Sequence, residues 1–131
     1  MQSLIDGLAE KGCTYESVML AQEEDLNIGV LFKQGVKAKN PRFIDNSDLG
    51  DVTRRKALVV DMKIGKFDFT LIGVHLKSGR ERVNQQIRDE QCKIIGRYIT
   101  ELRQQSREDI LLMGDFNMIP GEDVSNFLKS R

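Results

Sequence analysis

Residues 67–78 read FDFTLIGVHLKS and carry the clearest structural pattern in the chain. Phe67, Phe69 and Leu71 alternate with polar residues, and the run is then apolar at every position up to Val74. Alternation is typical of a strand with one covered face, and a continuous apolar run is typical of a strand covered on both faces. The stretch therefore predicts a strand that becomes buried on both sides.

Upstream of this stretch, the apolar spacing predicts one helix and three further strands. The expected elements are a helix within residues 1–12 and strands over residues 17–21, 28–32 and 57–64. Gly65-Lys66 is expected to turn the last of these strands into the 67–76 strand as a short hairpin. Residues 34–50 are polar and contain Asn40-Pro41, so we expect an irregular loop there.

Downstream, one apolar stripe marks the best helix of the chain. The stripe comprises Ile87, Ile94, Ile95, Tyr98, Ile99 and Leu102. Ser78 and Glu81 have the spacing of a capping box, although the helix could equally begin one turn later. Residues 110–113 are typical of a buried strand, and residues 124–128 indicate a short final helix. This order of elements predicts a layered α/β or α+β domain.

Composition narrows the classes of protein further. The chain has 131 residues, of which 40% are hydrophobic, and its 20 basic and 20 acidic residues give zero net charge. These values fit one globular domain and exclude a fibrous or highly charged disordered chain. No apolar run approaches the roughly 18 residues of a membrane span. Zero net charge disfavours general binding of polyanions but leaves a local phosphate site open.

His75 is the only histidine and lies at the end of the 67–76 strand. A lone histidine is often a structural residue with satisfied hydrogen bonds, and that interpretation stays open. In the alternative interpretation, the strand end presents the imidazole to a crevice. There it could donate to a phosphate oxygen or protonate a leaving oxygen.

Asp115 and Asn117 follow the apolar run of residues 110–113. If the backbone stays extended, this spacing aims both side chains the same way. The carboxylate could then bind a metal or orient an attacking water, and the carboxamide could hydrogen-bond a phosphate without adding negative charge. Alternatively, these residues merely cap a turn. The spacing is equally compatible with both interpretations.

Two basic clusters could face a phosphate, or could simply be solvated surface. They are Arg54-Arg55-Lys56, and Lys77 with Arg80 and Arg82. Glu23 and Glu24 could be metal ligands, but a polar hairpin turn explains them equally well. The chain has no glycine-rich phosphate loop, zinc-type spacing or nucleophile elbow.

Three features together resemble the endonuclease/exonuclease/phosphatase superfamily, which has the deoxyribonuclease-I-like fold. They are His75-Leu76-Lys77-Ser78, a helix containing Arg88 and Gln91, and an apolar strand that ends in Gly114-Asp115-Phe116-Asn117. The resemblance covers nearly the whole chain and implies an α+β domain that is part of a four-layer α/β/β/α sandwich. It also implies hydrolysis of phosphodiesters, or of phosphomonoesters in some branches, with a divalent metal such as Mg²⁺ or Mn²⁺.

The positions that match catalytic residues of this superfamily are His75, Asp115 and Asn117. The resemblance implies that Asp115 orients or deprotonates the attacking water and that Asn117 holds the phosphate. It implies that His75 contacts a phosphate oxygen or assists the leaving group, and that Asp115 and Asn117 lie at the metal. The residues expected to bind the substrate phosphate are Arg55, Lys77 and Ser78.

The chain departs from the superfamily pattern at both ends. The pattern begins with a Gln-Glu strand whose glutamate is the principal metal ligand and closes with an Asp-His pair. Gln22-Glu23 imitates the first pair, but the 28–32 strand follows it too closely to match.

We therefore expect residues 1–131 to be a truncated domain with little or no hydrolysis by itself. Its open strand edges are expected to favour a homodimer. DNA and RNA are among the possible substrates, and these residues do not distinguish between them. A non-catalytic binding module on the same scaffold, and a phosphomonoesterase, stay open as alternatives.

Overall fold

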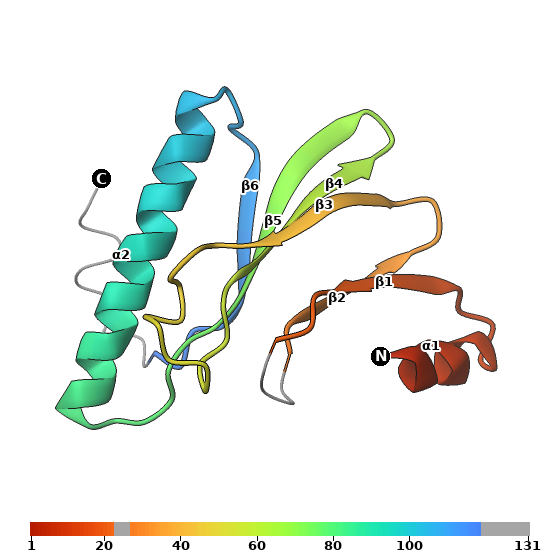
Figure 1. The fold of residues 1–131 in the computed structure, drawn as a ribbon. Coiled ribbons are helices and arrows are strands. Elements are labelled where there is room, and N and C mark those ends of the chain that lie inside the picture. Colours follow the sequence, from red (N-terminus) through yellow and green to blue (C-terminus); the bar gives the residue numbers. More distant parts are fainter. Residues whose placement is uncertain (23–26, 119–131) are drawn as a thin grey trace.

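The computed structural model describes residues 1–22 and 27–118, and Figure 1 shows how their helices and strands are arranged. In chain order they are α1 (Gln2–Ala9), β1 (Tyr15–Met19), β2 (Gly29–Lys33), β3 (Lys37–Phe43), β4 (Leu58–Ile64), β5 (Phe67–His75), α2 (Arg82–Gln104) and β6 (Ile110–Asp115). The helix within residues 1–12, the predicted hairpin at Gly65-Lys66 and the long amphipathic helix are all confirmed. The predicted helix at residues 124–128, and also Glu23 and Glu24, lie outside the described residues.

The strands form two sheets. β1 and β2 pair as an antiparallel hairpin, and the larger sheet has the order β3-β4-β5-β6. In the larger sheet β3, β4 and β5 are antiparallel neighbours, whereas β5 and β6 run parallel. A parallel pair needs a long crossover, and α2 supplies it. Consequently β5 and β6 end at the same edge of the sheet.

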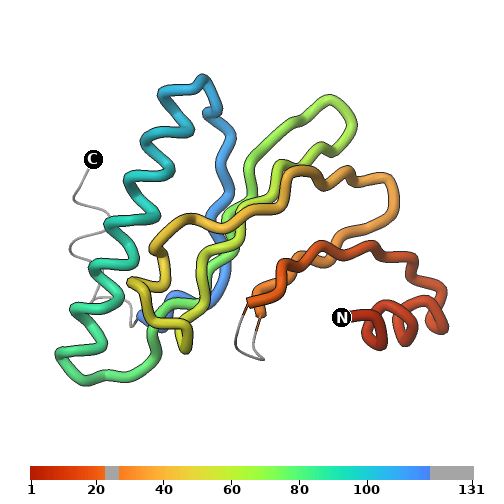
Figure 2. The backbone as a smooth tube through the Cα atoms, viewed as in Figure 1, coloured from red at the N-terminus to blue at the C-terminus, as the bar shows by residue number. Residues whose placement is uncertain are grey.

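Buried side chains pack on both faces of the larger sheet. Val59, Ile72 and Val74 belong to the group that packs against α2. Leu58 and Leu71 belong to the group that packs toward β1 and β2. Because successive strand residues point to opposite faces, β5 is covered on both sides, as predicted. The layers are therefore α2, the larger sheet and the β1–β2 sheet, as the backbone traces in Figures 1 and 2 also show.

The expectation of an irregular loop over residues 34–50 is wrong, because β3 lies within it. Its pairing with β4 shifts register between Lys39 and Arg42, and Asn40 within the shift has a φ of 50°. β3 is an edge strand whose side chains are mostly exposed, so it needs little apolar alternation. A proline at a bulge of an edge strand removes no essential ladder hydrogen bond. The polar, proline-containing sequence of β3 therefore gives no sign of a strand.

The helix after the HLKS stretch begins one turn later than a capping box at Ser78 requires. α2 starts at Arg82 with Glu81 as its N-cap residue, and no side chain caps it. Of the two starting points left open by the sequence, the later one is correct. The loop between β5 and α2 therefore includes Lys77 and Ser78.

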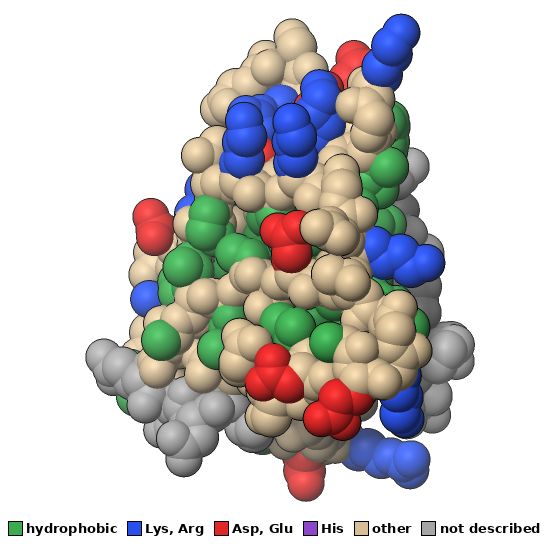
Figure 3. All heavy atoms as spheres, turned by 90° about the vertical axis from the view of Figure 1, so that its right-hand side faces the viewer, with side chains coloured by type: hydrophobic (Ala, Val, Ile, Leu, Met, Phe, Trp, Pro, Cys, Tyr) green, Lys and Arg blue, Asp and Glu red, His purple; other side chains and the backbone are tan. Residues whose placement is uncertain are grey.

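The edges and faces bear on association. The β3 edge carries Lys37, Lys39 and Pro41, residues that hinder pairing with another strand. Figure 3 views the molecule from the side of β1, β2 and α1 and shows Lys and Arg side chains gathered at its upper end. The homodimer stays a prediction. Within the described part of the chain, no helix is long and apolar enough to cross a membrane.

Candidate active site

The parallel register of β5 and β6 places His75 directly beside Asp115. The distance from His75 Nε2 to Asp115 Oδ2 is 3.9 Å, and the two side chains are 38% and 61% exposed. Both side chains lie at the strand ends, where solvent and a substrate can reach them. The structure thus brings an imidazole and a carboxylate together at one edge of the sheet, and the catalytic roles that the resemblance implies for them stay a prediction.

Gly114 makes this approach possible. Its φ of 138° is one that side-chain-bearing residues rarely adopt. A Cβ added at this position would lie 2.0 Å from the carbonyl oxygen of Val74. Only glycine therefore lets the ends of β5 and β6 come this close. Because Gly114 immediately precedes Asp115, this close approach also sets the position of the Asp115 backbone beside β5.

Asn117 ties the two strand ends together. Its backbone N–H donates to Asp115 Oδ1 at 2.8 Å, and its Nδ2 donates to the carbonyl oxygen of Leu76 at 2.9 Å. Leu76 in turn donates its N–H to the carbonyl oxygen of Asp115 at 2.9 Å. Asn117 has a φ of 50°, so the extended backbone assumed for the Asp-x-Asn spacing is not what places the two side chains. A turn brings them together instead.

Asp115 and Asn117 still keep groups that can take part in chemistry. The carboxylate has a second oxygen that faces His75, and the amide group of Asn117 has a second hydrogen beyond the one bound to Leu76. The capping interpretation and the functional interpretation are therefore compatible. The turn pre-organises the pair without using up its capacity.

The three predicted phosphate-binding residues lie in loops at this same edge. β4 starts at Leu58, opposite Gly73, so Arg55 precedes β4 where β5 ends. Ser78 is exposed, and Arg55 and Lys77 are partly buried. Hydrogen bonds from Thr53 lower the pKa of Asp51 below its ordinary value, and the nearby Lys77 ammonium contributes to this. Lys77 is therefore close to Asp51, which lies in the loop between β3 and β4.

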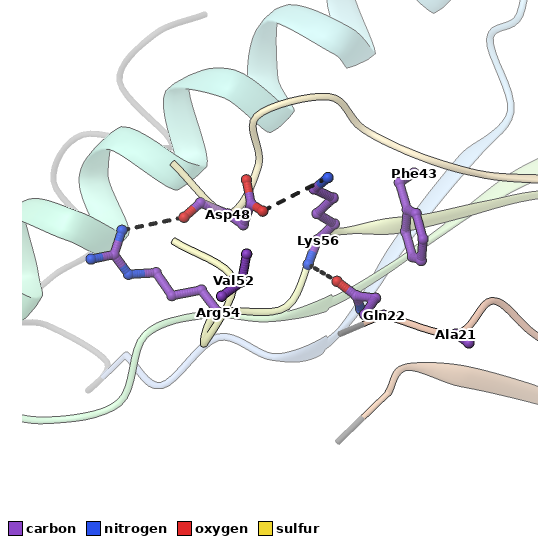
Figure 4. A pocket seen from close by; sticks show the side chains of 7 residues that line it. All are labelled: Ala21, Gln22, Phe43, Asp48, Val52, Arg54 and Lys56. Atoms are coloured by element: carbon purple, nitrogen blue, oxygen red, sulfur yellow. Dashed lines mark hydrogen bonds and ion pairs between the residues drawn. The ribbon is translucent and has the colours of Figure 1, made fainter. Parts of the chain in front are cut away.

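Figure 4 shows a pocket beside this edge. Its lining residues are Ala21, Gln22, Phe43, Asp48, Val52, Arg54 and Lys56. Lys56 Nζ lies 3.8 Å from Asp48 Oδ2, and Arg54 forms an ion pair with Asp51 at 3.0 Å. These two cations of the Arg54-Arg55-Lys56 cluster are thus matched by carboxylates of their own loop. Among the described residues Arg55 has no such ion pair.

Gln22 has a structural role in this pocket. Its Oε1 accepts the backbone N–H of Lys56 at 2.7 Å, which fastens the end of the β1–β2 hairpin to the start of β4. The rejection of Gln22-Glu23 as the metal-binding pair stays a prediction, because Glu23 lies outside the described residues.

The residues at the edge fit only part of a metal site. Over residues 1–22 and 27–118, no group of three or more His, Cys, Asp and Glu side chains could hold a metal ion. Mg²⁺ is commonly bound through one or two carboxylates together with substrate phosphates. Asp115 can supply one such carboxylate, and the side-chain oxygen of Asn117 is a neutral oxygen ligand of the same hard type.

Two buried polar residues of α2 form hydrogen bonds with the loop that follows β5 at this edge. Arg88 is 2% exposed and Gln91 is 0% exposed, and both contact the backbone of the loop after β5. The sequence placed them in the helix but assigned them no role. Their position one turn apart, next to the apolar stripe, was the available signal for burial.

Comparison with known proteins adds the fold. No family model and no curated protein sequence matches the chain. A truncated TDP2 of Caenorhabditis elegans matches with a TM-score of 0.71 and 19% identity, over 94% of this chain and 47% of that one. A TDP2 of D. rerio solved in complex with a single-strand DNA product matches with a TM-score of 0.68 and 18% identity, over 98% and 48%.

The chain has the deoxyribonuclease-I-like fold. The resemblance carried by His75–Ser78 and Gly114–Asn117 is thereby confirmed at the level of the fold. The chain spans less than half the length of these TDP2 structures. That the chain is part of a four-layer sandwich stays a prediction, because α1 lies next to β1 but contributes no buried residue.

Proposed function

We propose that this chain is part of the catalytic domain of a divalent-metal-dependent phosphodiester hydrolase of the nuclease type. One observation carries the proposal: an imidazole and a carboxylate, His75 and Asp115, lie 3.9 Å apart at the ends of two parallel strands. Asn117 links these strand ends by bonds to Asp115 Oδ1 and to the carbonyl oxygen of Leu76. The D. rerio TDP2 of the same fold was solved with a single-strand DNA product, which supports a nucleic-acid phosphodiester as the substrate.

The side chains divide the work by their chemistry. The Asp115 carboxylate orients the attacking water and accepts its proton as a general base. The free amide hydrogen of Asn117 donates to a phosphate oxygen, and His75 donates to a phosphate oxygen or to the leaving oxygen. A bound Mg²⁺ or Mn²⁺ would polarise the phosphate, with Asp115 and Asn117 among its ligands.

Phosphate binding is assigned to Arg55, Lys77 and Ser78. Lys77 is near enough to the carboxylates of Asp51 and Glu81 to contribute to the lowering of their pKa values, and these negative charges oppose its attraction for a phosphate. Arg55 forms no ion pair with any described residue and offers a planar guanidinium that suits phosphate oxygens. We expect Arg55 to contribute more to substrate affinity than Lys77 does.

Residues 1–131 by themselves are expected to hydrolyse phosphodiesters weakly or not at all. The described part of this edge offers Asp115 as an anionic metal ligand, and no group of three or more candidate ligands is found there. The same observation favours the second candidate function, a non-catalytic binding module that keeps the scaffold without the chemistry.

The experiment that separates these functions uses the complete reading frame that encodes these residues. Hydrolysis of single-stranded DNA, plasmid DNA, RNA and bis-nitrophenyl phosphate is measured with Mg²⁺ or Mn²⁺ and with a chelator. Activity that needs the metal and falls roughly 10²–10⁴-fold in His75→Ala and Asp115→Asn supports the hydrolase.

The matched control is Asp68→Asn, which changes an exposed carboxylate at the start of β5, the opposite end of the strand from His75, and is expected to keep wild-type turnover. Wild-type turnover in His75→Ala and Asp115→Asn would show that the site is wrongly assigned. Nucleic-acid binding without any turnover would favour the binding module.

A further inference from the structure

The face of α2 that packs on the larger sheet contains two buried polar side chains among its apolar ones. Arg88 is 2% exposed and Gln91 is 0% exposed, and Cys92 and Ile95 are buried on the same helix. Burying a charge or an amide is costly unless hydrogen bonds compensate for the lost water. Where those hydrogen bonds go therefore indicates what the two residues are for.

Gln91 uses both ends of its carboxamide to join two loops. Its Oε1 accepts the backbone N–H of Lys77 at 3.0 Å, and its Nε2 donates to the carbonyl oxygen of Ser47 at 3.0 Å. Ser47 then donates its hydroxyl to Ile44 at 2.7 Å and accepts the N–H of Ala57 at 2.9 Å. One buried side chain thus connects the loop after β5 with the loop before β4.

Arg88 holds the same loop at neighbouring atoms. Its Nη1 donates to the carbonyl oxygens of Lys77 at 2.9 Å and of Gly79 at 2.7 Å. Both backbone polar groups of Lys77 are therefore bound by α2. Leu76, one residue earlier, is bound by Asp115 and Asn117. The segment that follows His75 is held between β6 on one side and α2 on the other.

We infer that Gln91 and Arg88 are positioning residues for the proposed catalytic edge, an inference that rests on the proposed function. They fix the His75–Ser78 segment against the end of β6. Through Ser47, Gln91 also ties the loop that carries Arg55 to that segment. The two loops assigned to phosphate binding are thereby held in one relative position by a single carboxamide.

Gln91 contributes to stability as well as to the position of the two loops. An apolar side chain at position 91 would fill the same space without burying an amide, but it would leave the N–H of Lys77 and the carbonyl of Ser47 without their partner. Both contacts of Gln91 are made to loop backbone at the catalytic edge. The placement serves the geometry of that edge.

The test compares Gln91→Leu with Ile95→Ala, a control that removes buried volume one turn along α2 from an apolar residue of the same core. Amide exchange at Lys77 and the NMR shifts of the His75 ring are recorded for both variants in residues 1–131. Gln91→Leu is expected to lower Lys77 protection at least tenfold and to move the His75 shifts. Ile95→Ala is expected to lower Tm and leave both unchanged.

Gln91→Glu separates the two contacts, and it carries the test if Gln91→Leu does not fold. The variant keeps an oxygen acceptor for Lys77 but places a second oxygen against the carbonyl of Ser47. Protection is expected to survive at Lys77 and to fall at Ala57. Wild-type exchange and shifts in the Gln91 variants, or the same changes in Ile95→Ala, would overturn the inference.

A kinetic measurement separates the proposed hydrolase function from the positioning role of Gln91. It uses the protein encoded by the whole reading frame that contains these residues. If that protein is active, Gln91→Leu is expected to lower kcat/KM for bis-nitrophenyl phosphate at least tenfold, whereas Ile95→Ala keeps it. An inactive wild-type protein would count against the proposed function, and the exchange and shift measurements would still decide whether Gln91 positions the loop.

Discussion

Two carboxylates of the larger sheet, Asp61 and Asp115, differ in their hydrogen bonding and in their exposure to solvent. Toward one end, Asp61 accepts hydrogen bonds from Arg107 at 2.7 Å, from Arg42 at 3.3 Å and from Asn40 at 3.0 Å, and its side chain is 18% exposed. At the other end, Asp115 is 61% exposed and lies 3.9 Å from His75.

The difference separates a structural carboxylate from one available for chemistry. The Asp61 group links β4 to β3 and to the segment after α2, and Arg42 also donates to the Tyr98 hydroxyl at 2.9 Å. Asp115 keeps an oxygen directed at the imidazole and open to solvent. A carboxylate whose oxygens all accept hydrogen bonds from the protein stabilises the fold. A carboxylate with an oxygen left open can bind a metal or a water.

The largest expected effect is a loss of activity, without a matching loss of stability, when the Asp115 charge is removed. Asp115→Asn is expected to lower hydrolysis by the complete protein roughly 10²–10⁴-fold. Because the side chain is largely exposed, the same change should alter the free energy of unfolding by less than about 1 kcal/mol. Turnover and thermal unfolding measured on the same preparations check both statements. A large loss of stability in Asp115→Asn would contradict the assignment.

Gly114→Ala should break the catalytic end by steric means. The added Cβ would lie 2.0 Å from the Val74 carbonyl oxygen, so β5 and β6 would have to separate at their ends. We expect a loss of about 2–4 kcal/mol in the free energy of unfolding, together with loss of activity. Chemical denaturation measures it, and Gly96→Ala, with nothing within 4 Å of its Cβ, is the control. Equal effects of the two substitutions would refute the close-approach argument.

Asp61→Asn should affect the opposite end and leave the catalytic end unchanged. Loss of the charge weakens the bonds from Arg42 and Arg107, which should cost about 1–2 kcal/mol because the group is only partly buried. Turnover is expected to stay at the wild-type level. The measurement is urea denaturation at neutral pH, and activity loss without stability loss would invert the comparison.

Asp61 also predicts a dependence of stability on pH. Burial raises the pKa of this carboxyl, but bonds from Asn40, Arg42 and Arg107 outweigh it and set the pKa below the ordinary value of 3.8. The stability from the charged form is therefore fully present above pH 3.8 and is lost as the pH falls through the lower, folded pKa. Asp61→Asn should flatten the unfolding profile in that acid range. An unchanged profile would mean that other carboxyls dominate.

The smallest effect is expected for an exposed ion pair. Lys63 and Asp68 face each other on β4 and β5 at 2.8 Å, with side chains that are 44% and 67% exposed. Such pairs contribute about 0–1 kcal/mol, and added salt weakens them. Asp68→Asn should therefore change Tm only slightly and activity not at all. A loss as large as that of Asp61→Asn would show that the number of hydrogen bonds is a poor guide here.

The sequence by itself determined the elements whose patterns are local. The stripe of α2, the turn at Gly65-Lys66 and the double burial of β5 follow from spacing within one element, because period and turn chemistry are properties of neighbouring residues. His75 and Asp115 could be chosen as candidates for a similar reason, since each follows an apolar run that ends in polar residues.

Only the tertiary structure decided how these parts meet. The parallel register puts His75 beside Asp115, and a turn at Asn117, not an extended backbone, links their strands. β3 was hidden because an edge strand is defined by its neighbour β4 and not by its own apolar alternation. Gln91 could be placed on a helix from its sequence position. Its two contacts lie in loops far away along the chain, and such distances are set only when the layers pack.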